Sequence, residues 1–213
     1  MAEEYTADQI EALDGVESIR RRTVMYVGRL DSPDLTTRLL MQALCHALDC
    51  AVDGRCTEIT IEAAERSARV RYDAALPLAR TPQGMIAAEV LLTLPAACSS
   101  MKKHLRIGDK YCSLGMAVLT AVTREMLVEI VEGERSCTIE LACGRPSRPS
   151  SIVPSPAASA DSTRISFTLD ADILQGNTKF DLEQIRAACV EAQTDFAAVR
   201  IEVRALEVAG TDR

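Results

Sequence analysis

Residues 35–54 have the sequence LTTRLLMQALCHALDCAVDG, in which apolar side chains recur every three or four positions. This spacing places leucine, alanine and valine side chains on one face and predicts an amphipathic helix. Asp31 or Ser32 is expected to cap its start, and Gly54 is expected to end it, because glycine readily adopts the left-handed conformation that closes helices. The stretch therefore predicts one long helix that packs against a core.

The rest of the chain carries a mixture of helical and strand patterns. Helices are expected over residues 16–22, 85–94, 114–122 and 181–192, and strands over 57–63, 68–73, 127–142, 163–170 and 199–205, with a turn at Gly133. Strands and helices do not alternate strictly, as they would in a doubly wound fold. The order favours an α+β fold class, a two-layer α/β sandwich with helices on one face of a mixed sheet.

Three segments stand apart from these elements. Residues 1–28 form an N-terminal arm, and residues 96–113 show no period and are expected to be a long flexible loop. Residues 145–162 contain four of the eight prolines and are expected to be an irregular Pro/Ser-rich loop. No internal repeat is found, and a single domain is expected over residues 1–213.

The composition excludes several classes of protein. Hydrophobic residues make up 47% of the chain, and no apolar run reaches the ~18 residues that span a bilayer. The acidic N-terminus lacks an apolar signal segment, so a soluble cytoplasmic protein is expected, with no membrane association. A net charge of −7 argues against a primary role in binding nucleic acid, which needs clustered Lys and Arg.

Cys45, His46, Asp49 and Cys50 form a cluster of possible metal ligands on the 35–54 helix. Positions 45 and 49 stack on one face, as do 46 and 50, so a Zn²⁺ site is conceivable. The simpler interpretation is that both cysteines fill core volume while His46 faces solvent or a hydrogen-bond partner. No metal is therefore expected, and the eight cysteines are expected to be reduced.

Residues 5–28, YTADQIEALDGVESIRRRTVMYVG, carry a family resemblance. The matching positions are Tyr5, Ile10, Leu13, Gly15, Arg20, Arg22, Met25, Tyr26 and Gly28. They resemble the arm of the N-terminal ATPase domain found in the B subunit of DNA gyrase and the E subunit of topoisomerase IV, in the superfamily of gyrase, heat-shock chaperone, histidine kinase and MutL. Residues 87–94 and 179–201 also resemble this domain. The resemblance covers nearly the whole chain and implies the Bergerat-type ATPase fold.

The resemblance also implies where catalytic residues would lie. The family's general base, a glutamate, falls at Gln42, and its magnesium-binding asparagine falls at His46. An amide cannot accept a proton at neutral pH, so Gln42 could at most orient a water molecule. Imidazole is a poor magnesium ligand, because magnesium prefers oxygen donors. No catalytic residue is therefore expected.

The nucleotide-binding motifs of the family are also altered. The adenine motif Asp-x-Gly-x-Gly-x-Pro maps onto residues 73–77, which keep Asp73 and lose both glycines. The phosphate-binding lid, whose backbone N–H groups cradle phosphates, maps onto residues 109–115 and keeps only Gly115. The vestigial nucleotide pocket implied by the resemblance comprises Tyr5, His46, Asp49, Asp73, Gly115 and Thr163.

These changes predict a pseudo-ATPase rather than an enzyme. The chain ends at Arg213, so the family's following transducer domain and its phosphate-binding lysine are expected to be absent. A catalytically inactive domain that acts as a protein-interaction or regulatory module is the expected function. The expected partner is a protein, which could be a second copy or a related gyrase-type subunit. No cofactor is expected, although ATP or Mg²⁺ binding stays open. The alternatives are a nucleotide- or small-ligand-binding sensor without hydrolysis, and a divergent ATPase.

Overall fold

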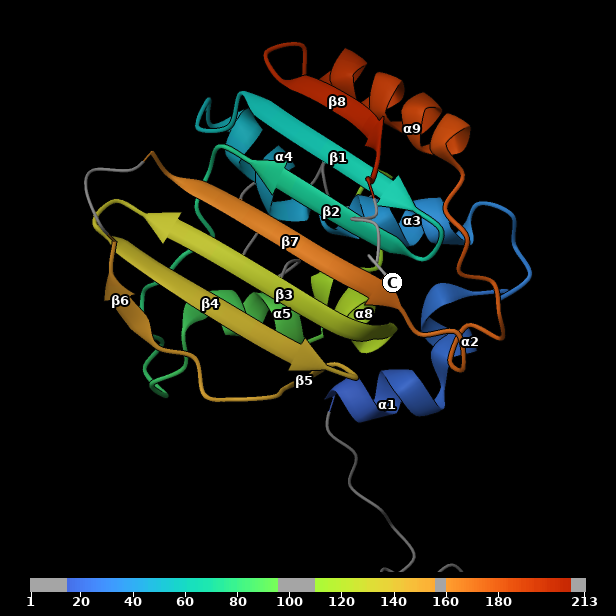
Figure 1. Ribbon diagram of the computed structural model, residues 1–213, viewed down its shortest axis with the longest axis horizontal. Helices are drawn as coiled ribbons and strands as arrows, with labels where there is room; N and C mark the ends of the chain where they lie inside the picture. Colours follow the sequence, from blue (N-terminus) through green and yellow to red (C-terminus); the bar gives the residue numbers. More distant parts are fainter. Residues whose placement is uncertain (1–14, 96–109, 156–159, 208–213) are drawn as a thin grey trace, which may run out of the picture.

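The computed structural model describes residues 15–95, 110–155 and 160–207, and its strands form one mixed sheet (Figure 1). The strands are β1 (Glu58–Ala64), β2 (Ser67–Tyr72), β3 (Thr123–Glu132), β4 (Arg135–Ala142), β5 (Arg145–Pro146), β6 (Ile152–Pro154), β7 (Ser162–Leu169) and β8 (Arg200–Ala205). Their order is β5-β4-β3-β7-β2-β1-β8, and β6 also pairs with β4. Within the described residues, β1 and β8 pair in parallel, whereas the other strand pairs are antiparallel.

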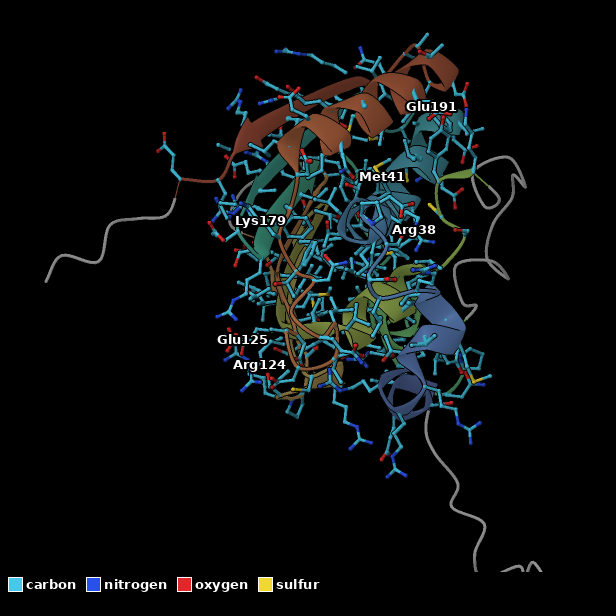
Figure 2. All side chains as sticks on the ribbon, turned by 90° about the vertical axis from the view of Figure 1, so that its right-hand side faces the viewer. Arg38, Met41, Arg124, Glu125, Lys179 and Glu191 are labelled. Atoms are coloured by element: carbon cyan, nitrogen blue, oxygen red, sulfur yellow. The ribbon has the colours of Figure 1, made fainter. Side chains whose placement is uncertain are left out.

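Helices cover one face of this sheet. They are α1 (Gly15–Arg21), α2 (Thr23–Val27), α3 (Leu35–Gln42), α4 (Cys45–Val52), α5 (Ala87–Thr93), α8 (Met116–Ala121) and α9 (Leu182–Asp195). Figure 1 shows α3, α4, α5 and α8 behind the sheet, and the edge-on view of Figure 2 separates the two layers. The expected α+β two-layer sandwich is confirmed. In the part of the chain that the structure describes, no helix has both the length and the apolar character needed to cross a membrane.

The sheet presents a different chemistry on each face. Alternate side chains of β1 and β2, such as Ile59, Ile61 and Val70, are buried under the helices. The opposite face carries cross-strand ion pairs, including Arg69–Glu62 at 3.0 Å and Arg164–Glu129 at 3.1 Å. This period-two alternation is what the sequence pattern predicted, and it makes the outer face a solvated surface of balanced charge.

The stretch 35–54 forms two helices rather than one. α3 ends at Gln42, and the Ala43 and Leu44 N–H groups donate to the carbonyls three residues earlier, at 2.9 and 3.1 Å. This tight turn replaces the regular α-helical bonding. The expected cap was also wrong, because α3 starts after Asp34, while Ser32 bonds to the Asp34 carboxylate. Periodicity alone did not reveal the break, since the apolar spacing continues across it.

The segment 145–162 is not wholly irregular, as the sequence had suggested. β5 and β6 both add to the edge of β4, and β7 begins at Ser162. Pro146 and Pro154 lie in these short outer strands. An edge strand tolerates proline because no further neighbour needs its missing N–H group.

A buried ion pair fastens α1 to the rest of the fold. Arg20 donates to the Asp170 carboxylate and to the Ala121 carbonyl, both at 2.7 Å. The Asp170 side chain is 2% exposed. Burial raises the pKa of this carboxyl, but the hydrogen bonds and charge of Arg20 outweigh that effect, so the pKa is lowered. α1, the end of α8 and the end of β7 are thereby joined.

Candidate functional site

Gln42 lies at the end of α3, with its amide group inside the fold. The residue is 2% exposed. Its Nε2 group donates to the Arg38 carbonyl at 2.7 Å and to the Tyr111 carbonyl at 3.3 Å. Its Oε1 atom accepts from the N–H groups of Leu114 at 3.2 Å and Gly115 at 2.8 Å. Both ends of the amide are therefore held by backbone groups.

Gly115 makes the shorter of the two backbone contacts with the Gln42 oxygen. It precedes α8 with a φ of +88°, a conformation that favours glycine because it has no Cβ atom. The N–H groups of Leu114 and Gly115 belong to the segment that the resemblance assigned to phosphate binding. Here the Gln42 oxygen accepts both of them, so the start of α8 is joined to the end of α3.

His46 is half-buried on α4 and faces the sheet. Its ring centroid lies 5.8 Å from that of Tyr72 on β2, and its Nε2 atom lies 3.6 Å from the Cys50 sulfur. Burial lowers the pKa of His46 to about 4, with a further contribution from the positive charge of Arg55. The imidazole is therefore neutral at pH 7. It packs as an aromatic ring and carries no charge toward a phosphate.

Asp73 directly follows β2 and is exposed, but its carboxylate is engaged. It accepts from the N–H groups of Thr57 and Glu58, both at 2.9 Å, and from the Thr57 hydroxyl. Burial raises the pKa of this carboxyl, but these hydrogen bonds outweigh it and lower the pKa to about 2. Asp73 thus stays ionised and caps the start of β1.

Thr163 on β7 is buried and opposite Tyr72 in the β2–β7 pairing. Its hydroxyl accepts from the Leu76 N–H at 2.9 Å and donates to the Ala74 carbonyl at 2.8 Å. The Leu76 side chain is fully buried. The loop that would carry the adenine motif is therefore fastened to β7 through Thr163, with Leu76 packed into the core.

The four possible metal ligands of α4 do not converge. Cys45 points toward Gln42, with its sulfur 3.9 Å from Oε1, whereas Cys50 lies beside His46. Asp49 is half-buried on the same helix. Burial raises the pKa of Cys50, which disfavours the thiolate that metals require. Across residues 15–95, 110–155 and 160–207, no three His, Cys, Asp or Glu side chains are grouped to hold a metal ion. Tyr5 and the rest of residues 1–14 lie outside the described residues.

Known proteins resemble this chain in sequence and in fold. DNA gyrase B of Thermus thermophilus is 26% identical over 201 residues, which is 92% of this chain and 31% of the relative. DNA gyrase B of Archaeoglobus fulgidus is 32% identical over 125 residues, 57% of this chain and 20% of the relative. The crystal structure of the 43K ATPase domain of T. thermophilus gyrase B, in complex with an aminocoumarin, superposes with a TM-score of 0.74 at 26% identity. The homologues of this chain are the B subunits of DNA gyrase and topoisomerase IV.

The superposition with the gyrase B domain covers 91% of this chain and 49% of that chain. The chain spans about a third or less of the length of these two gyrase B relatives. No protein-family model matches it. The gyrase B-like fold is therefore established over nearly the whole chain, while the activity of the longer relatives belongs to those proteins.

A second set of contacts at this site could not be read from the sequence. Lys110 and Tyr111 both contact Asp195, the last residue of α9. Eighty-four positions separate Tyr111 from Asp195, and no local pattern links them. Only the packing of α9 beside α3 brings the two together.

Proposed function

We propose that this gyrase B-like domain does not hydrolyse ATP and acts as a protein-interaction or regulatory module. The observation that carries the proposal is the amide of Gln42, which is held at both ends by backbone groups. A general base must accept a proton from water, and a neutral amide does not do so at pH 7. To orient water, Gln42 would first have to release Leu114 and Gly115.

The residues around Gln42 do not fit a magnesium ion. Magnesium selects oxygen ligands in near-octahedral geometry. The position that the resemblance assigns to the magnesium ligand holds His46, a neutral ring packed against Tyr72 and Cys50. The oxygen of Gln42 is already occupied by two N–H groups. No catalytic step through ATP or Mg²⁺ is therefore derived for this chain.

Two further residues support the loss of nucleotide chemistry. The Thr163 hydroxyl accepts a hydrogen bond from the Leu76 N–H group and donates one to the Ala74 carbonyl. Asp73 accepts its hydrogen bonds from Thr57 and Glu58 at the start of β1. The groups that the resemblance assigns to adenine binding thus form hydrogen bonds within the protein. To bind a ligand instead, they would have to break these hydrogen bonds, at a cost in free energy.

The proposed partner is a protein, either a second copy of this chain or a related gyrase-type subunit. α2 supports this, because its Val24 and Met25 side chains are 56% and 76% exposed and adjacent. Exposed apolar side chains next to one another favour association more than isolated ones do. α2 also directly follows the α1 helix that Arg20 fixes in place, so these side chains are presented on a rigid element.

The decisive experiment measures phosphate release from Mg·ATP by the purified protein and by a Gln42→Ala variant. We expect no release above the protein-free rate for either protein. Turnover by the wild-type chain that the Gln42→Ala variant loses would overturn the proposal and favour the divergent ATPase. That alternative draws its support from the relatives, which are gyrase and topoisomerase IV B subunits.

The interaction part of the proposal has its own test. Sedimentation velocity of the protein over a wide concentration range, alone and mixed with a gyrase-type B subunit, should reveal a complex. A Met25→Asp variant should weaken that complex, whereas a Val190→Asp variant, which alters an exposed apolar residue on α9, should not. Monomers under every condition would contradict the partners named here.

A nucleotide sensor without hydrolysis is the second candidate. Its support is the ionised carboxylate of Asp73, which could accept a hydrogen bond from an adenine amino group. Isothermal titration with a non-hydrolysable ATP analogue and Mg²⁺ separates the two functions. Micromolar binding that the Asp73→Asn variant loses would favour the sensor, and no heat would leave the interaction module.

A further inference from the structure

Residues 110–115, which lead into α8, are held at two separate places. On one side, Gln42 of α3 contacts the backbone of Tyr111, Leu114 and Gly115. On the other side, the end of α9 contacts Lys110 and Tyr111. Figure 2 shows that the labelled Glu191 of α9 and Arg38 and Met41 of α3 lie on the same side of the molecule. We call residues 110–115 the stem.

Asp195 makes the main contacts from α9. Its Oδ2 atom accepts from the Lys110 ammonium at 2.8 Å and from the Tyr111 hydroxyl at 2.7 Å. Glu191, one helical turn earlier, lies 3.0 Å from the same ammonium. The Tyr111 ring also packs edge-on against Phe196, with centroids 5.8 Å apart. Two donors of the stem therefore converge on a single carboxylate oxygen.

Asp195 is placed where it does not favour its own helix. It is the last residue of α9, and a negative charge at a helix C-terminus opposes the helix dipole. The compensating interactions come from the stem. The position of Asp195 is thus better explained by its contacts with the stem than by any contribution to the stability of α9.

Tyr111 connects the two places at which the stem is held. Its hydroxyl donates to Asp195, and its carbonyl accepts from Gln42, whose oxygen in turn accepts from Gly115. Tyr111 is 7% exposed, so its hydroxyl bond is partly shielded from water. A displacement of Tyr111 would pull on the Gln42 amide and loosen Leu114 and Gly115.

From this chain of contacts, we propose that Asp195 is a latch that keeps the stem closed against α3. Its release lets residues 110–115 open locally and frees the N–H groups of Leu114 and Gly115 from Gln42. The device needs neither nucleotide nor partner, so it goes beyond the proposed function and does not depend on it. It is a conformational switch built into the fold, controlled from the end of α9.

The latch should be sensitive to salt. The Lys110 and Asp195 side chains are each 44% exposed, and ion pairs at such exposure are weakened by screening. The Tyr111–Asp195 bond and the Gln42 contacts are more buried and respond less. Raising the ionic strength should therefore increase local opening of the stem, while the strands of the sheet remain hydrogen-bonded.

The test is amide hydrogen exchange measured residue by residue by NMR on the whole chain. Asp195→Ala should accelerate exchange at Leu114 and Gly115 by about fivefold relative to the wild type, and Tyr111→Phe should act in the same direction. Asp172→Ala is the matched control, because the exposed ion pair of Asp172 is with Arg124 and not with a residue of the stem. It should leave exchange at both amides unchanged.

Two results would overturn the latch. One is an unchanged exchange rate at Leu114 and Gly115 in the Asp195→Ala variant. The other is an equal acceleration in the stem and in β2 and β7, which would show a loss of global stability instead. The proposal would be established if amide exchange at low salt were faster in the Asp195→Ala variant than in the wild type, and only within the stem.

Discussion

The side chain of Gln42 accepts a hydrogen bond from the N–H group of Gly115 at 2.8 Å, across 73 positions of the chain. This single contact joins the end of α3 to the start of α8. It places an uncharged, fully engaged amide where the family resemblance would put a general base. The same amide also defines which substitutions the site can tolerate.

Gln42→Glu should destabilise the protein at neutral pH. The carboxylate can still accept from Leu114 and Gly115, but its other oxygen would face the carbonyls of Arg38 and Tyr111, which cannot donate. We expect a loss of about 2 kcal/mol in the free energy of unfolding at pH 7, measured by urea denaturation.

The loss caused by Gln42→Glu should shrink as the pH falls, because a protonated carboxyl can donate to a carbonyl. The introduced group has a raised folded-state pKa, so its penalty is absent below the unfolded pKa and grows as the pH rises. Gln83→Glu, at an exposed position, is the control and should change little. An equal stability of Gln42→Glu and wild type at pH 7 would contradict the assigned hydrogen bonds.

Removing the buried carboxylate of Asp170 should be costly. Asp170→Ala leaves the Arg20 guanidinium without its anion in a largely buried site. We expect the free energy of unfolding to fall by about 3 kcal/mol in urea denaturation. Glu129→Ala, which breaks the half-exposed pair with Arg164, should cost less than about 1 kcal/mol. Similar losses for the two variants would show that burial does not decide the value of the pair.

Asp73 should contribute stability that depends on pH. Its folded-state pKa of about 2 lies below the ordinary value of about 3.9 for an unfolded chain. The contribution is therefore present above that ordinary value and is lost as the pH falls through about 2. Thermal unfolding should separate wild type from Asp73→Asn clearly at pH 6 and much less at pH 2.5. A gap that stays constant with pH would rule out the ionised carboxylate as its source.

His46 should titrate well below an ordinary histidine. Its pKa of about 4 follows from burial and from Arg55, against about 6.5 in an unfolded chain. Because the folded state favours the neutral ring, stability should fall as the pH drops from 6.5 toward 4. NMR titration of the imidazole carbons measures the midpoint directly, and a His104→Gln variant assigns the signal, since the chain has two histidines. A midpoint near 6.5 would show that the His46 ring is exposed to solvent and would contradict its burial against Tyr72.

Several elements followed directly from local patterns. The alternation in β1 and β2, the turn at Gly133 and the apolar periodicity of α5, α8 and α9 were all readable, because side chains that share a face repeat at a fixed period. The break after Gln42 was not readable. At the break, the Ala43 and Leu44 N–H groups donate to carbonyls three residues earlier, although the apolar spacing continues across it. The Gln42 side chain at this point contacts backbone groups 69 to 73 positions away in the chain, which no local pattern shows.

For the candidate site too, some features followed from the sequence and others only from the tertiary structure. The sequence by itself determined the fold class, the gyrase B resemblance and the identity of Gln42, His46, Asp73 and Thr163, because residue type and local periodicity are properties of the chain. Only the tertiary structure decided what those groups contact: Gly115 for Gln42, Tyr72 for His46, and Asp195 for Tyr111. Hydrogen bonds and burial depend on which segments the sheet and helices bring together, and that arrangement is set by packing across the whole chain.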